Sequence, residues 1–165
     1  MSVSPQTFIP GTTIEPMRAT VAELSAALDG GRLSSQALTS FYEERIQLLN
    51  PALRAVITVS KSAAAEATAS DSRRSSGQAG PLEGIPVLVK DNVQAAGMPT
   101  TAGSLALLPA APDDAFIVRR LREAGAVILG KANLSEWANF RSTHSTSGWS
   151  SVGGQCANPY DLRRN

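Results

Sequence analysis

A lysine, an acid and an amide stand together directly after a short apolar run in this sequence. The run covers residues 85–89 and is followed by Lys90, Asp91 and Asn92. Four or five apolar residues bounded by turn residues and polar residues predict a strand that is buried on both faces. Ligands bind at the carboxyl ends of the strands in open α/β sheets, so Lys90 is placed where a site would form. Partial loss of solvation there would lower the pKa of the lysine amine, which makes it better suited to act as a general base.

The composition is that of a globular domain and gives no electrostatic reason to expect a nucleic acid or an anionic membrane as a partner. The 165 residues are 42% hydrophobic and carry a formal net charge of +1, and a chain of this length suits one domain. The single cysteine, Cys156, excludes an internal disulfide and is compatible with a reducing compartment. It has no neighbours at metal-ligand spacing and His144 is the only histidine, so neither a metal nor a cofactor is expected.

The sequence also gives no sign of a membrane protein. No stretch approaches the roughly 18 consecutive apolar residues that a membrane span needs. Residues 1–19 lack the basic and apolar regions of a signal peptide. The cytoplasm is therefore the expected location.

The first half of the chain is predicted to be mainly helical. Residues 1–19 lack periodicity and are expected to form an N-terminal arm, with one domain portion over 20–165. The spacing of Thr20 and Glu23 predicts a capping box at the start of a short helix. Further elements are expected as follows: helices over 34–50 and 62–71, a strand over 55–59, and a Ser/Arg/Gly linker over 72–80.

A second strand is predicted after the Lys90 motif, with one helix between the two strands. This helix follows the Thr-, Gly- and Pro-rich connection 92–112 and is ended by Gly125. The strand covers 126–129, and a strand–helix–strand unit predicts that the two strands are parallel. The apolar face of the helix is expected to bury Phe116, Ile117, Leu121 and Ala124.

Four motifs in this order resemble the amidase signature family, and within it the bacterial peptide amidases. They are GIPVLVKDN at 84–92, TTAGS at 100–104, GAVILGKANLSEWANF at 125–140 and GGQCANPYD at 153–161. The resemblance runs from about residue 21 to the last residue and implies an α/β fold, a mixed sheet flanked by helices. It also implies that residues 20–165 are the N-terminal part of such a domain, so that the fold is incomplete in this chain.

The resemblance implies hydrolysis of carboxylic amide bonds, with peptide C-terminal amides as the expected substrates. In this family one serine attacks the carbonyl carbon, and a second serine passes the proton towards a lysine. Backbone N–H groups of a Gly/Ser-rich loop bind the oxyanion, and no metal or cofactor takes part. The family's lysine matches Lys90. The Gly/Ser-rich block is expected beyond Asn165, so both serines are missing and this chain alone is expected to be inactive.

The resemblance also suggests two substrate-binding residues and no obligate protein partner. Asn139 is expected to hydrogen-bond to the carbonyl or amide of a small-molecule or peptide amide. Ser104 is expected beside the lysine, where it would help to hold the ammonium. Each of the two could equally be a turn residue without a role in binding. Lys131, after the second strand, is expected to be solvated.

Three other interpretations remain open from the sequence. A catalytic serine paired with His144 is one of them, since Ser145, Ser147, Ser150 and Ser151 crowd the loop after Phe140, although Gly-, Ser- and Thr-rich composition simply makes loops. Residues 140–165 otherwise show neither a helical nor a strand period. The chain could also be a truncated product or a binding remnant without turnover. A nucleotide-binding βαβ module is disfavoured because neither strand is followed by a glycine-rich phosphate-binding motif.

Overall fold

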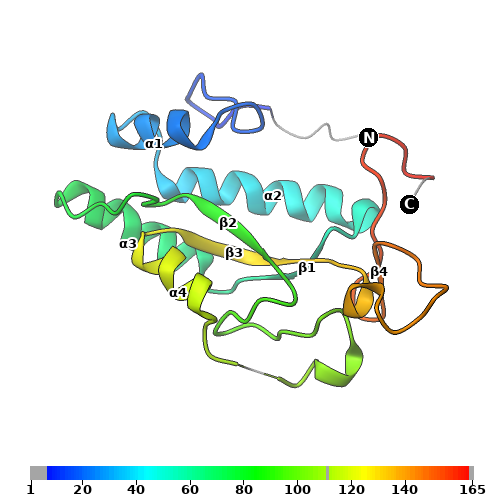
Figure 1. Cartoon of the computed structure of the whole chain (residues 1–165). Helices are drawn as coiled ribbons and strands as arrows, with labels where there is room; N and C mark the ends of the chain where they lie inside the picture. The colour runs from blue at the N-terminus through cyan, green and yellow to red at the C-terminus, as the bar shows by residue number, and fades with distance from the viewer. Residues whose placement is uncertain (1–6, 111, 164–165) are drawn as a thin grey trace. The chain divides into compact units, whose positions relative to one another are not determined.

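The computed structural model describes residues 7–110 and 112–163 (Figure 1). The helices are α1 (Val21–Asp29), α2 (Ser35–Leu53), α3 (Ala63–Ser75) and α4 (Phe116–Glu123), with short 3-10 helices η1 (Leu105–Leu107) and η2 (Glu136–Asn139). The strands are β1 (Val56–Val59), β2 (Pro86–Lys90), β3 (Val127–Ala132), β4 (Trp149–Ser150) and β5 (Gly154–Gln155).

The chain forms two compact units that are interleaved along the sequence. Of the described residues, unit 1 contains 7–48, 62–87 and 120–129, and unit 2 contains 49–61, 88–110, 112–119 and 130–163. Both β2 and β3 begin in unit 1 and end in unit 2. Unit 1 is therefore mainly helical, and unit 2 carries β1, the ends of β2 and β3, and the loops that follow them.

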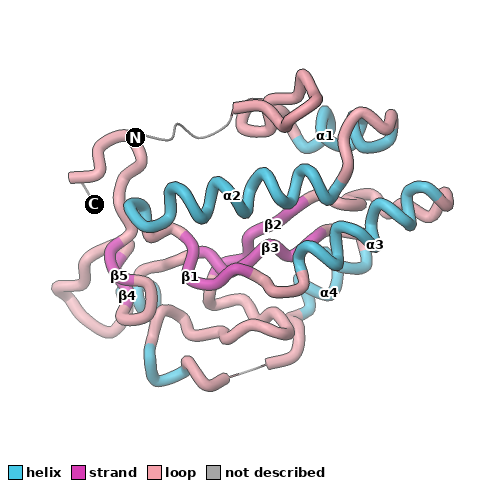
Figure 2. The backbone as a smooth tube through the Cα atoms, turned by 180° about the vertical axis from the view of Figure 1, so that it is seen from behind, coloured by secondary structure: helices cyan, strands magenta, loops and turns pink. Residues whose placement is uncertain are grey.

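The sheet has the order β1-β3-β2 (Figure 2), and its strands are both parallel and antiparallel. β1 is antiparallel to β3, and Thr58 pairs with Lys131. β2 and β3 are parallel, because their starts are joined by the bond from Val127 N–H to Ile85 O, and their ends by the bond from Asp91 N–H to Ala132 O, each 3.0 Å. The predicted parallel pair and the mixed sheet are both confirmed.

The core of unit 1 lies between α1 and α2, which run side by side (Figure 1). The capping box of Thr20 and Glu23 starts α1 as predicted. The buried apolar side chains are Ile9, Leu24, Ala27, Leu28, Leu33, Leu38, Phe41 and Ile85. Ile9 belongs to the expected N-terminal arm, so the described part of that segment packs into this core. The boundary at residue 19 stays a prediction.

α3 packs closely on the start of β3 because its buried face is made of alanines. Ala63 and Ala67 contact Val127 and Leu129, and none of the four is more than 3% exposed. α3 continues to Ser75, so the prediction of a linker from residue 72 was wrong for its first four residues.

The predicted buried face of α4 was wrong for Phe116 and Ile117. Phe116 and Ile117 are 71% and 59% exposed, whereas Val118 is fully buried. At 3.6 residues per turn, a stripe centred on Val118 continues through Leu121 and places Phe116 on the opposite side of the helix. Leu121 and Ala124 are half-buried.

A buried carboxylate, Glu83, fixes the connection that leads into β2. Its side chain is 2% exposed and accepts hydrogen bonds from Arg73 at 2.7 and 3.1 Å and from the Gly80 N–H at 3.0 Å. Gly125 lies against it with φ +89°, and a Cβ atom there would stand 2.8 Å from Glu83 Cα. Burial alone would raise the pKa of Glu83, but the bonds from Arg73 and Gly80 outweigh it and lower the pKa.

We predict that this carboxylate stabilises the protein above, but not well below, its ordinary pKa of 4.5. Because the pKa is lower in the folded state, the unfolded chain takes up the proton first, and the contribution of Glu83 fades as the pH falls through the folded pKa. Glu83→Gln should lower the free energy of unfolding by about 1–3 kcal/mol at pH 7. The deficit should shrink at pH 3, as measured by urea unfolding.

Glu123→Gln is the matched control, since its carboxylate pairs with Arg120 on the exposed surface. Surface pairs of this kind contribute little, so this variant should unfold like the parent at both pH values. A deficit for Glu83→Gln that stays the same at pH 7 and pH 3 would contradict the assignment.

Candidate active site

Lys90 is the last residue of β2, at the point where the strand leaves the sheet, as predicted. Its side chain is exposed, whereas its neighbours Val89 and Asp91 are 7% and 0% exposed. Successive side chains of a strand point to opposite faces, so a buried Val89 and a buried Asp91 require Lys90 to point the other way. The Lys90 side chain is therefore exposed, on the face of the strand opposite to Val89 and Asp91.

Asp91 turns inward and folds the following loop back onto the strand end. Its Oδ2 atom accepts bonds from the Thr101 N–H and the Gly103 N–H, both at 3.2 Å, and from the Thr101 hydroxyl. The Ala102 N–H donates to the Asp91 carbonyl oxygen at 3.1 Å. These bonds give the loop a defined shape, although its described residues form no strand and one helical turn, η1.

Lys131 is fully buried, so the expectation that it is solvated was wrong. Its Nζ atom donates to Thr100 Oγ1 at 2.8 Å and to Pro99 O at 3.2 Å, and it lies 3.4 Å from Asp91 Oδ1. Burial lowers the pKa of Lys131, and the charge of Asp91 partly opposes this effect.

The length of β3 explains why Lys131 was missed. The strand was expected to end at Leu129, but it continues to Ala132, and Lys131 pairs with Thr58 of β1 in the middle of the sheet. Gly130 permits this extension, since a Cβ atom there would stand 3.2 Å from Val59 Cα. The position of Lys131 within the central strand therefore buries its side chain, although a lysine is ordinarily found in contact with water.

Ser104 lies in the same loop as the residues that bind Asp91. It is 7% exposed, and its N–H donates to Thr101 O at 2.9 Å. It precedes η1 without capping that turn through its hydroxyl. The structure therefore places Ser104 in the loop that follows Lys90, and its role in binding stays a prediction.

Asn139 ends a left-handed turn of three residues. Trp137, Ala138 and Asn139 have φ values of 50°, 53° and 66°, a conformation that costs an L-residue about 1–2 kcal/mol. These residues belong to η2, whose backbone is therefore left-handed at Trp137 and Ala138. Asn139 Nδ2 donates to Ser147 Oγ at 3.0 Å. Strained backbone of this kind is concentrated at functional sites.

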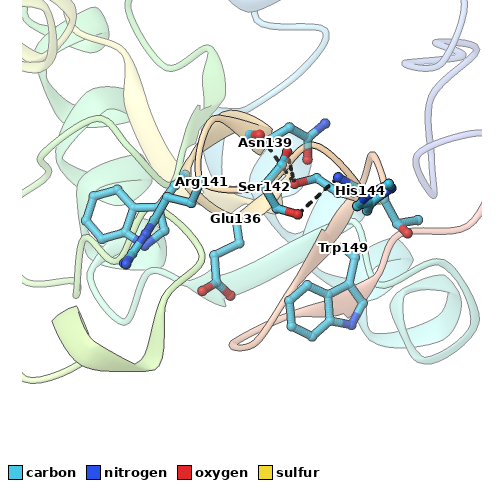
Figure 3. Close-up of a pocket in the computed structure, with 9 residues that line it drawn as sticks. Glu136, Asn139, Arg141, Ser142, His144 and Trp149 are labelled. Atoms are coloured by element: carbon cyan, nitrogen blue, oxygen red, sulfur yellow. Dashed lines mark hydrogen bonds between the residues drawn. The ribbon is translucent and has the colours of Figure 1, made fainter.

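Asn139 lines an open pocket of about 450 Å³ (Figure 3). The other lining residues are Glu136, Trp137, Arg141, Ser142, His144, Ser145, Thr146 and Trp149. The hydroxyl of Ser145 donates to the carbonyl oxygens of Asn139 and Ser142, at 3.3 and 3.1 Å. His144 is joined to Ser142 through its backbone N–H rather than its imidazole. The described bonds of this loop thus hold its backbone and do not form a Ser–His relay.

A second, mainly apolar groove of about 750 Å³ borders the loop that follows Lys90. It is lined by Asn92, Val93, Gln94, Thr100, Ala102, Leu107, Ala110, Pro112, Ala115, Ile117, Leu134, Trp137 and Ala138. Trp137 lies between this groove and the first pocket and lines both. Its backbone N–H donates to Ala102 O at 3.0 Å, which ties the left-handed turn to the Asp91 loop.

Asn133 joins the segment before β1 and the hairpin of β4 and β5 to the end of β3. Its Nδ2 atom donates to Arg54 O at 2.8 Å and to Gly154 O at 3.2 Å, and its Oδ1 atom accepts from Ser150 Oγ at 2.8 Å. The antiparallel hairpin falls within residues 140–165, where no strand period was visible. Two-residue strands are too short to produce one.

Two kinds of feature are absent from the described residues. Within 7–110 and 112–163, no three His, Cys, Asp or Glu side chains are grouped so that they could hold a metal ion. In the same part of the chain, no helix is both long and apolar enough to cross a membrane.

Comparison with known proteins decides the family. The family model described as Amidase matches residues 37–165. The chain belongs to the amidase family. The fold agrees with this assignment: the peptide amidase from Stenotrophomonas maltophilia superimposes with a TM-score of 0.86 at 55% identity, over 89% of this chain and 31% of that one. An amidase family protein from Bacillus anthracis gives 0.82 at 47% identity, over 87% and 30%.

Sequence relatives show the same pattern of coverage for this amidase chain. A probable amidase of Arabidopsis thaliana is 44% identical over 93% of this chain and 31% of its own length. A glutamyl-tRNA(Gln) amidotransferase subunit of Halorhodospira halophila is 48% identical over 87% of this chain and 29% of its length. The chain thus spans about 30% of these relatives and corresponds to an N-terminal portion of an amidase. The predicted family and fold class are confirmed.

We predict that Asn133→Ala loosens the hairpin more than its exposure suggests. The substitution leaves the Arg54 carbonyl and the Ser150 hydroxyl without their bonds to the amide, which should lower the free energy of unfolding by about 1–3 kcal/mol. Hydrogen exchange of residues 148–156 should accelerate. Ser142→Ala is the control, because it removes one bond at an exposed position and should leave exchange in 148–156 as in the parent.

Proposed function

We propose that the protein containing this chain hydrolyses carboxylic amide bonds by a Ser–Ser–Lys mechanism in which Lys90 is the base. The observation that carries the proposal is the position of Lys90: it ends a strand of the sheet, points away from the buried Asp91, and adjoins a loop that is fixed by hydrogen bonds. Membership of the amidase family supports the same reaction.

The chemistry requires groups beyond this chain. A serine hydroxyl is a weak nucleophile at its own pKa, so it needs a base within hydrogen-bond reach, directly or through a relay. Developing charge on the carbonyl oxygen needs preorganised donors. In the proposal Lys90 accepts the proton, and both serines and the oxyanion loop come from a Gly/Ser-rich block that residues 1–165 do not contain.

We propose peptide C-terminal amides as the substrates. The solved peptide amidase at 55% identity supports this choice. In this proposal Asn139 hydrogen-bonds to the substrate amide or carbonyl, and Ser104 helps to hold the Lys90 ammonium. The apolar groove between the Lys90 loop and Trp137 could accommodate an apolar side chain of the peptide.

A second candidate is the amidase component of a larger enzyme. The 48% identity to a glutamyl-tRNA(Gln) amidotransferase subunit favours it. The two candidates differ in their partners, since a peptide amidase as proposed here acts without an obligate protein partner. Release of ammonia from a peptide amide by the purified protein alone supports the first candidate, whereas activity that requires a co-purified partner protein supports the second. For either candidate we propose the cytoplasm as the location.

We predict that Lys90→Ala in the full-length protein lowers kcat for a peptide amide by at least about a hundredfold, because general-base catalysis contributes a factor of that order or more. The thermal midpoint should change little, since the Lys90 side chain is exposed. The assay follows ammonia release. Residues 1–165 expressed alone should show no turnover.

Lys61→Ala is the matched control, because Lys61 is also an exposed lysine that follows a strand of unit 2. This variant should keep the turnover of the parent. Near-normal kcat for Lys90→Ala would rule out the lysine as the base. Turnover by residues 1–165 alone would place the nucleophile inside this chain, where Ser145 to Ser151 would be the first candidates.

A further inference from the structure

The ion pair of Lys131 and Asp91 is buried completely, with both side chains 0% exposed. Charged groups are rarely buried to this degree, because taking each charge out of water costs several kcal/mol. An apolar pair of similar volume is often as stable or more so. Stability alone therefore does not account for two charges at the end of β2, directly beside Lys90.

The two oxygens of Asp91 have different tasks. Oδ2 accepts the bonds from Thr101 and Gly103 that shape the loop. Oδ1 accepts no hydrogen bond within the described part of the chain and faces the Lys131 ammonium at 3.4 Å. The ammonium thus balances the charge of the carboxylate from one side, and this allows the carboxylate to remain buried and bind the loop from the other.

Lys131 also holds the start of the same loop. Its two hydrogen bonds go to Pro99 O and Thr100 Oγ1, one residue before the segment that Asp91 binds. Among the described residues, Asp91 is the charged group in contact with this ammonium. The loop from Pro99 to Ser104 is therefore attached to the sheet at two points, one on β3 and one at the end of β2.

We propose that Lys131 is a positioning residue for the amide hydrolysis: through Asp91 and Thr100 it fixes the end of β2 and the 99–104 loop, and so sets where Lys90 and Ser104 point. This inference rests on the proposed function. Lys90 and Asp91 are adjacent in the chain and point to opposite faces, so the direction of one side chain is determined by the backbone that holds the other. A displacement of about 1 Å in such a group can cost about a hundredfold in rate.

The test uses the full-length protein with three variants: Lys131→Met, the double variant Asp91→Asn/Lys131→Met, and Arg122→Met. Lys131→Met should lower kcat by about a hundredfold, with KM changed less than about threefold, because the substrate is still bound and the base is misplaced. The double variant removes both charges, while the amide oxygen that replaces the carboxylate can still accept bonds from the loop. It should recover at least about tenfold of the lost kcat.

Arg122→Met is the control for stability. It removes the half-buried pair of Arg122 with Glu66, which belongs to unit 1, whereas the Lys90 loop belongs to unit 2. It should lower the thermal midpoint and leave kcat unchanged. A kcat for Lys131→Met within threefold of the parent would overturn the inference. The inference would also be overturned if Arg122→Met lost as much kcat as Lys131→Met at an equal loss of thermal stability. A double variant with a kcat no higher than that of Lys131→Met would overturn it as well.

Hydrogen exchange of the same variants separates this inference from the proposed function. If the parent hydrolyses no amide, the proposed function fails, but exchange of residues 100–104 still reports on the loop. Faster exchange there in Lys131→Met than in Arg122→Met supports the attachment of the loop by Lys131. Equal exchange in the two variants overturns it.

Discussion

The carboxylate of Asp91 holds together a strand end, a loop and a second strand, and the candidate site depends on this contact. A carboxylate in the interior needs donors for its oxygens and a counter-charge nearby. The loop supplies the donors and β3 supplies the charge. Because each partner is needed to keep the others buried, the shape of the loop and the register of the strands are coupled.

Lys90 and Lys131, two of the three lysines of unit 2, show how position decides the environment of a side chain. Lys90 ends an outer strand of the three-stranded sheet, whereas Lys131 lies in its central strand. The first is exposed and available to a reaction, and the second is committed to internal contacts. The same side-chain amine thus has a structural role in β3 and a proposed catalytic role in β2.

Local patterns predicted the parts of the fold that local interactions determine. The capping box of Thr20 and Glu23, and the parallel pair of β2 and β3, follow from short-range rules and were found as expected. The burial of Lys131 could not be predicted in this way, because it depends on β1 pairing with β3 across 70 residues of chain or more. The left-handed turn at Trp137 was missed for a related reason: of its three residues only Asn139 is of a type that favours positive φ, and the bond from the Trp137 N–H to Ala102 O holds the turn. The motif that contains Lys90 was located correctly, while the network behind it emerged only from the structure.

The passage of β2 and β3 from one unit to the other has a consequence for how such a protein can evolve. The chain changes units inside β2, between Val87 and Leu88, and inside β3, between Leu129 and Gly130. A gene segment that encoded either unit alone would cut both strands in the middle and separate residues that share one backbone ladder. Exchange of the units by recombination between homologous genes would therefore join mismatched half-strands. Change in this region is expected to proceed by point substitution and loop insertion, and the whole region should be inherited as one block.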